Sequence, residues 1–73
     1  MSRICAIGEP ERVRVFALAG VSVAPAEDAR AARAAWVALP PATALVILTP
    51  MAGAALEDER RSSEAPLCAV MAP

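Results

Sequence analysis

The sequence predicts an α/β fold built on a small parallel sheet, and three features carry this prediction. Residues 4–7 form a short apolar run, which ends at Gly8 and Pro10, a tight turn followed by the start of a helix. Gly20 can take the left-handed conformation that ends a helix, and apolar extended character resumes at Val21. Residues 44–48 are continuously apolar, as expected for a parallel strand covered on both faces.

The first half of the chain is predicted to contain two strands flanking a helix. These elements cover residues 3–8, 10–19 and 21–24. Val13 and Phe16 recur at helical spacing within the helix. Glu9 and Glu11 lie at its start, where the positive end of the helix dipole favours acids, so we interpret both as solvated carboxylates.

The second half is predicted to alternate between helix and strand. These elements are a helix from residues 25–26 to 39, a strand over 44–48, a helix over 50–62 and a strand over 67–71. Ala32, Trp36 and Leu39 recur at helical spacing in the first helix, and Pro40 ends it. Gly53 weakens the helix predicted over residues 50–62. We expect core packing for Trp36, with an interface anchor as the alternative.

Strand-helix alternation with right-handed crossovers predicts the sheet order 2-1-3-4. This is a flavodoxin-like three-layer sandwich with about three helices, formed by a single domain over residues 1–73. The apolar residues are mostly alanine and branched aliphatics, which bury little area each. We therefore expect a marginally stable domain that gains stability by docking on a larger partner.

Composition excludes several ligand classes. The formal net charge is −1, from seven arginines and eight acids without lysine, so no basic surface for nucleic acid is expected. With no histidine, Cys5 and Cys68 cannot complete a structural zinc site. Both cysteines lie on predicted apolar strands, which favours reduced, buried thiols over a disulfide.

One stretch is long enough to cross a bilayer. Residues 34–56 carry no charge, but Pro40, Pro41, Pro50 and Gly53 interrupt them. We therefore expect the stretch to divide into separate elements, without direct membrane insertion. A weak exposed helical turn follows it, in which Glu57 precedes two arginines at pairing distance.

Ligands of such sheets bind above the carboxyl ends of the strands, where this chain offers little chemistry. Gly8 alone cannot form a phosphate cradle. Thr49 stands where a phospho-accepting receiver domain would need an aspartate. Ser62, Ser63 and the cysteines have no histidine to activate them. The prediction is a protein that is not an enzyme, with no catalytic, cofactor-binding or metal-binding residues and no small-molecule ligand.

Two segments resemble a known family. Residues 4–10, Ile-Cys-Ala-Ile-Gly-Glu-Pro, and residues 16–21, Phe-Ala-Leu-Ala-Gly-Val, closely resemble the opening of the F subunits of the V-type and A-type rotary ATPases. Val15 stands where that family often has glycine, and Glu9 and Pro10 replace its commoner acidic pair. The later segments agree with the family only in kind.

The resemblance implies a noncatalytic component of the central rotor stalk, held against the long coiled-coil D subunit inside the A/B headpiece. Such a component is cytoplasmic and peripheral to the membrane, and it couples ATP turnover to rotation. Family members usually continue for about thirty residues past the fourth strand, including a terminal helix beside the coiled coil, and this sequence stops at Pro73. A regulatory or small-ligand-binding domain of the same fold, or a degenerate truncated form of the stalk component, is the alternative.

Overall fold

The computed structural model describes residues 3–73 and contains a four-stranded, all-parallel sheet ordered β2-β1-β3-β4. The strands are β1 (Arg3–Gly8), β2 (Ser22–Pro25), β3 (Thr43–Leu48) and β4 (Leu67–Val70). The helices are α1 (Pro10–Val13), the 3-10 helix η1 (Arg14–Ala19), α2 (Ala29–Val37), α3 (Pro50–Ala55) and α4 (Glu57–Arg60). The predicted flavodoxin-like topology is therefore confirmed.

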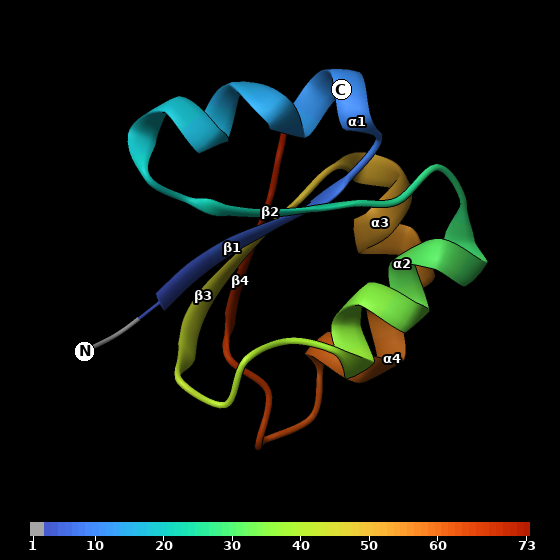
Figure 1. Cartoon of the computed structure of the whole chain (residues 1–73). Coiled ribbons are helices and arrows are strands. Elements are labelled where there is room, and N and C mark those ends of the chain that lie inside the picture. The colour runs from blue at the N-terminus through green and yellow to red at the C-terminus, as the bar shows by residue number, and fades with distance from the viewer. Residues whose placement is uncertain (1–2) are drawn as a thin grey trace.

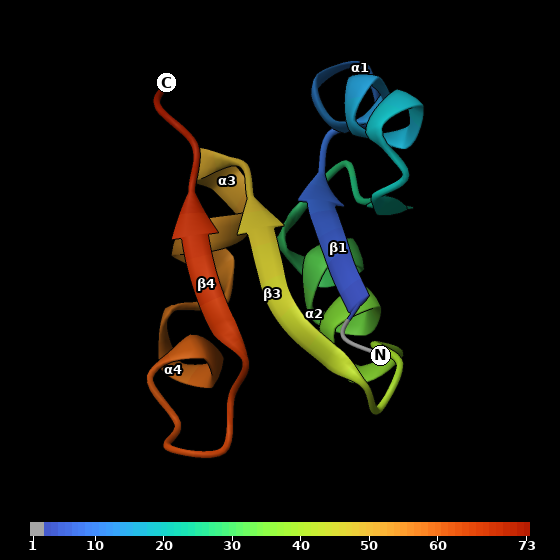
Figure 2. The same ribbon diagram turned by 90° about the vertical axis from the view of Figure 1, so that its left-hand side faces the viewer.

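The two faces of the sheet are covered unequally. Helices α2, α3 and α4 lie on one side of it, whereas α1 and η1 lie toward the other side (Figure 1). α1 contacts β1 and β2, and η1 contacts β2. Figure 2 shows that no helix within residues 3–73 lies in front of β3 and β4 on that second face.

The main core lies between the sheet and helices α2 and α3. Its fully buried members come from strands, loops and helices, namely Ile7, Ala26, Ala32, Val46, Leu48, Ala52 and Leu56. Trp36 and Leu39 pack against this cluster but stay partly exposed, which agrees with the predicted core role of Trp36. Because three of the seven buried members are alanines, the core is small.

The first predicted helix is present but changes type halfway. It is α-helical only over Pro10–Val13 and continues as a 3-10 helix over Arg14–Ala19. Val15 and Phe16 have low helix propensity, and tighter i to i+3 bonding is common near helix ends. Gly20 ends the segment with a φ of 81°, which is the predicted left-handed cap.

The predicted start of the second helix is wrong. Pro25 extends β2 by pairing with Gly8, and the Ala26 amide donates to the Gly8 carbonyl at 2.7 Å. The helix begins at Ala29 instead, because the Asp28 side chain accepts a 2.8 Å hydrogen bond from the Ala31 amide. A side-chain cap satisfies an otherwise unpaired amide, so it determines the helix start more strongly than proline does.

The third predicted helix divides into α3 and α4 at Leu56. Leu56 is fully buried in the main core, whereas the acidic turn that follows it is at the surface. The chain changes direction at this break, so the Leu56 side chain can pack in the core while the acidic turn lies at the surface. The predicted pairing in the exposed turn is confirmed, since Arg61 Nη2 lies 2.7 Å from Glu57 Oε1.

Candidate functional site

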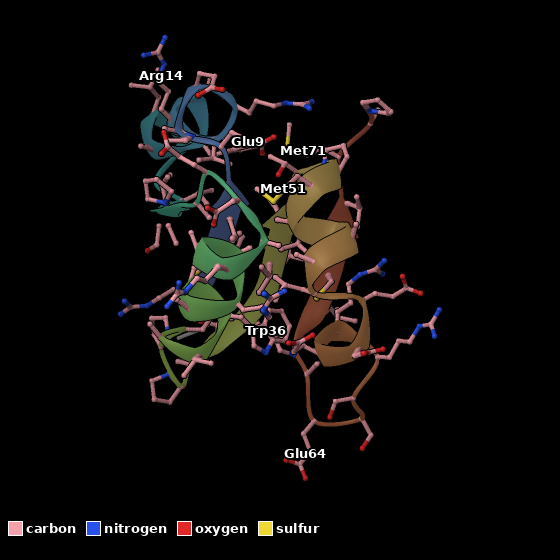
Figure 3. The ribbon with its side chains drawn as sticks, turned by 90° about the vertical axis from the view of Figure 1, so that its right-hand side faces the viewer. Glu9, Arg14, Trp36, Met51, Glu64 and Met71 are labelled. Atoms are coloured by element: carbon pink, nitrogen blue, oxygen red, sulfur yellow. The ribbon has the colours of Figure 1, made fainter. Side chains whose placement is uncertain are left out.

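The carboxyl edge of the sheet is where parallel α/β folds commonly bind their ligands. Residues that follow three of the strands gather there, and Figure 3 shows Glu9, Met51 and Met71 at this end of the molecule. Trp36 and Glu64 lie at the opposite end. The predicted positions after β1, β3 and β4 are therefore brought together.

Thr49 and Glu9 form the polar centre of this edge. The Thr49 hydroxyl donates a 2.7 Å hydrogen bond to Glu9 Oε1, and its oxygen accepts one of 3.4 Å from the Ala52 amide. Thr49 thereby caps α3. The hydrogen bond from Thr49 is the main reason why the pKa of Glu9 is lowered.

Glu9 is partly exposed, but it is not only a solvated acid, because its carboxylate also accepts the hydrogen bond from Thr49. The signal is present in the sequence, because β1 and β3 are neighbours in the predicted order and the carboxyl ends of adjacent parallel strands meet. Glu9 follows β1 and Thr49 follows β3. The Glu9–Thr49 pair can be predicted only if the ends of β1 and β3 are considered together.

The Glu9–Thr49 pair does not form a reactive site. Thr49 is fully buried, so no substrate can reach its hydroxyl oxygen. Gly8 lies against it, and a Cβ atom at Gly8 would collide with the Thr49 side chain, which leaves no space between the two strands. The pair therefore serves to join the α1 and α3 helix starts.

The two thiols are free and cannot reach one another. Cys5 is buried and Cys68 is half-buried. Both are in register with Val46, on opposite sides of β3, so two strand spacings of about 4.8 Å separate them. That distance exceeds the limit of about 7 Å between the Cα atoms of a disulfide. Burial raises the pKa of the Cys68 thiol and so disfavours its nucleophilic form.

The half-covered face of the sheet carries a cluster of apolar side chains. Side chains alternate along a strand, so Leu45 and Ile47 point away from the core that contains Val46 and Leu48. Strand register places Leu45 between Ile4 and Leu67, and Ile47 between Ala6 and Ala69. We define the open face as the residues Ile4, Leu45, Ile47, Leu67 and Ala69.

The open face is most exposed on β4, at the sheet edge, whereas Leu45 and Ile47 on β3 are half-buried. The exposed fraction is 41% for Ile4 and 77% for Leu67, and Ala69 is also exposed. Ala6 is fully buried, because it lies on β1 where α1 packs. The expectation that residues 44–48 are covered on both faces is met only in part, because Leu45 and Ile47 are half-buried although no helix of residues 3–73 covers them. The exposed apolar surface on β4 was not predicted.

Comparisons with known proteins give no relative. No protein-family model matches the chain, and no curated protein or solved structure matches it significantly. In the described part of the chain, no helix has the length and hydropathy needed to cross a membrane. Residues 3–73 also contain no group of three or more cysteine or acidic side chains placed to hold a metal ion.

Proposed function

We propose that this chain is a noncatalytic docking subunit that binds a helical partner through the open face. Parallel sheets occur almost only with both faces covered by helices, because their strands are apolar on both sides. Here β3 and β4 carry apolar side chains on a face that no helix of residues 3–73 covers. This uncovered face is the observation that carries the proposal.

The dimensions of the open face fit one helix. β3 and β4 lie about 4.8 Å apart, and an α-helix with its side chains is about 10 Å wide. A single helix laid along the two strands would cover Leu45, Ile47, Leu67 and Ala69. An apolar stripe at helical spacing is the surface that such a partner needs.

The area of the open face also indicates a larger partner. Three strands over about five residues cover on the order of 200 Å², whereas each side of a stable complex buries about 800 Å². The partner therefore needs further contacts. η1 lies next to this side of the sheet and offers Val15 and Leu18, with exposed fractions of 59% and 91%.

The particular complex that we propose is the central rotor stalk of a V-type or A-type ATPase. Residues 4–10 and 16–21 resemble the F subunits of these enzymes, and the partner would be the long helices of the coiled-coil stalk component, the D subunit. In this role the protein works in ATP synthesis or proton transport without catalysing it. Its place would be cytoplasmic, on the rotor within the A/B headpiece and peripheral to the membrane.

Co-purification with the coiled-coil stalk component of a V/A-type ATPase tests the proposal. We expect the wild-type chain to bind the coiled coil, and Leu67→Glu to lose binding because it places a charge on the open face. Val37→Glu is the matched control, since Val37 has an exposed fraction of 85% and lies on α2, across the sheet. A wild-type chain that fails to bind the coiled coil at low salt contradicts the rotor-stalk assignment. Binding that survives Leu67→Glu contradicts the assigned surface.

A further inference from the structure

A recess lies at the edge of the sheet opposite to Glu9 and Thr49. Its cavity has a volume of about 340 Å³ and is bounded by the end of α2, the turn before β3, α4 and the loop before β4. Ligand pockets in proteins have volumes of about 300–1,000 Å³, so this cavity can hold a small group. It shares no residue with the open face.

The walls of the cavity combine an aromatic ring with proline rings. Trp36 lines it together with Pro40, Pro41 and Pro66. Trp36 is partly buried and packs against the main core, which holds the indole in place. Such a wall suits an apolar stem, and an indole face also attracts a cation.

Every charged residue of the lining is acidic. Glu59 lines the cavity from α4 and Glu64 from the following loop. Figure 3 shows the Glu64 side chain at the loop tip, pointing away from Trp36, so we take Glu59 as the charged residue of the site. The nearby arginines are bound elsewhere, since Arg60 Nε donates to the Gly53 carbonyl at 3.0 Å and Arg61 pairs with Glu57.

The orientation of α2 adds to this negative potential. The helix runs from Ala29 to Val37, so its carboxyl end faces the cavity beside Trp36 and Leu39. The carboxyl end of a helix dipole favours a positive charge. The carboxylate of Glu59, the indole of Trp36 and the end of α2 all select the same kind of ligand.

We propose that this cavity binds an alkyl-ammonium or alkyl-guanidinium group, with its stem on Trp36 and the prolines and its charge at Glu59. The proposal is independent of the rotor-stalk function. Free amines and the basic side chains of a polypeptide share this chemistry, and the test separates the two sources.

Intrinsic fluorescence provides a direct measurement, because Trp36 is the only tryptophan and the chain has no tyrosine. We expect saturable changes in Trp36 emission on titration with putrescine and agmatine, or with the tripeptide acetyl-Gly-Arg-Gly-amide. Binding of the tripeptide alone supports the proposal and assigns the site to a polypeptide side chain. 1,4-Butanediol, which matches putrescine in length without charge, should produce no saturable change.

Two charge-removing variants complete the test. Glu59→Gln should weaken binding at least tenfold, because it removes the carboxylate that lines the cavity. Asp58→Asn removes the same charge from α4 at a residue outside the lining, and should change the affinity less than twofold. The proposal is overturned if neither the amines nor the tripeptide gives a saturable change, if 1,4-butanediol binds equally well, or if both variants weaken binding to the same extent.

Discussion

The Thr49 hydroxyl donates a 2.7 Å hydrogen bond to the Glu9 carboxylate, and this bond joins the starts of two helices on opposite sides of the sheet. Thr49 also caps α3 through the Ala52 amide. Glu9 itself caps no amide of α1, because its carboxylate faces Thr49 instead. The carboxyl edge is therefore fixed by one buried hydroxyl with two partners.

Thr49→Val should lower the free energy of unfolding by about 1–2 kcal/mol, because it removes the cap of α3 and the bond to Glu9 while keeping the side-chain shape. Urea denaturation measures the change. NMR titration of Glu9 distinguishes the cause: its pKa should rise toward the ordinary value in Thr49→Val and stay lowered in Thr49→Ser. A lowered pKa in both variants would show that the hydroxyl is not responsible.

Gly8→Ala should destabilise the domain by about 1–3 kcal/mol, the usual cost of overpacking, because the new Cβ collides with the Thr49 side chain. Thr49→Ala in the same chain should recover part of this loss, since it removes two of the colliding atoms. Gly20→Ala is the control: nothing lies within 4 Å of its Cβ position, and its cost comes from a φ of 81° alone. Its effect should be additive with Thr49→Ala.

The stability contributed by Glu9 should be lost in acid. The pKa of Glu9 is lowered in the folded state, so the unfolded chain has the higher affinity for the proton. As the pH falls through the ordinary value of 4.5, protonation therefore favours the unfolded chain. The stabilisation is thus complete above pH 4.5 and disappears as the pH falls through the folded-state pKa. Urea denaturation of wild type and Glu9→Gln should show a stability difference at about pH 6 that shrinks at about pH 3. A difference that does not vary with pH would contradict this prediction.

Leu56→Ala should cost about 2–5 kcal/mol, because Leu56 is fully buried at the α3–α4 break. In a domain of this size that loss can leave much of the population unfolded, which circular dichroism would detect. Leu67→Ser removes an equally large side chain from the open face, yet it should change stability by less than about 0.5 kcal/mol. Equal losses for the two variants would mean that Leu67 is buried in solution.

The sheet was predictable from sequence because local signals and topology rules agree. The apolar run of residues 44–48, bounded by prolines, and the glycine at position 20 each favoured one interpretation, and right-handed crossovers then determined the strand order. The exact helix bounds were harder. Pro25 and Asp28 both resemble helix starts in sequence, and the pairing of Pro25 with Gly8 decides between them only in three dimensions.

The candidate surfaces were not predictable in the same way. The open face exists because α1 and η1 cover β1 and β2 but not β3 and β4, and the strand residues themselves do not encode that difference. The cavity beside Trp36 depends on the break at Leu56, which places α4 near the end of α2. Helical spacing alone indicates one continuous helix there.

The sheet order also determines when this chain can fold during synthesis. β1 is made first but lies between β2 and β3, so it obtains its second neighbour only after Leu48 has left the ribosome. Every strand pair is parallel and joins segments distant in sequence, which places such domains among the slower folders of their size. The nascent chain therefore carries β1 with one edge unpaired until β3 has been made.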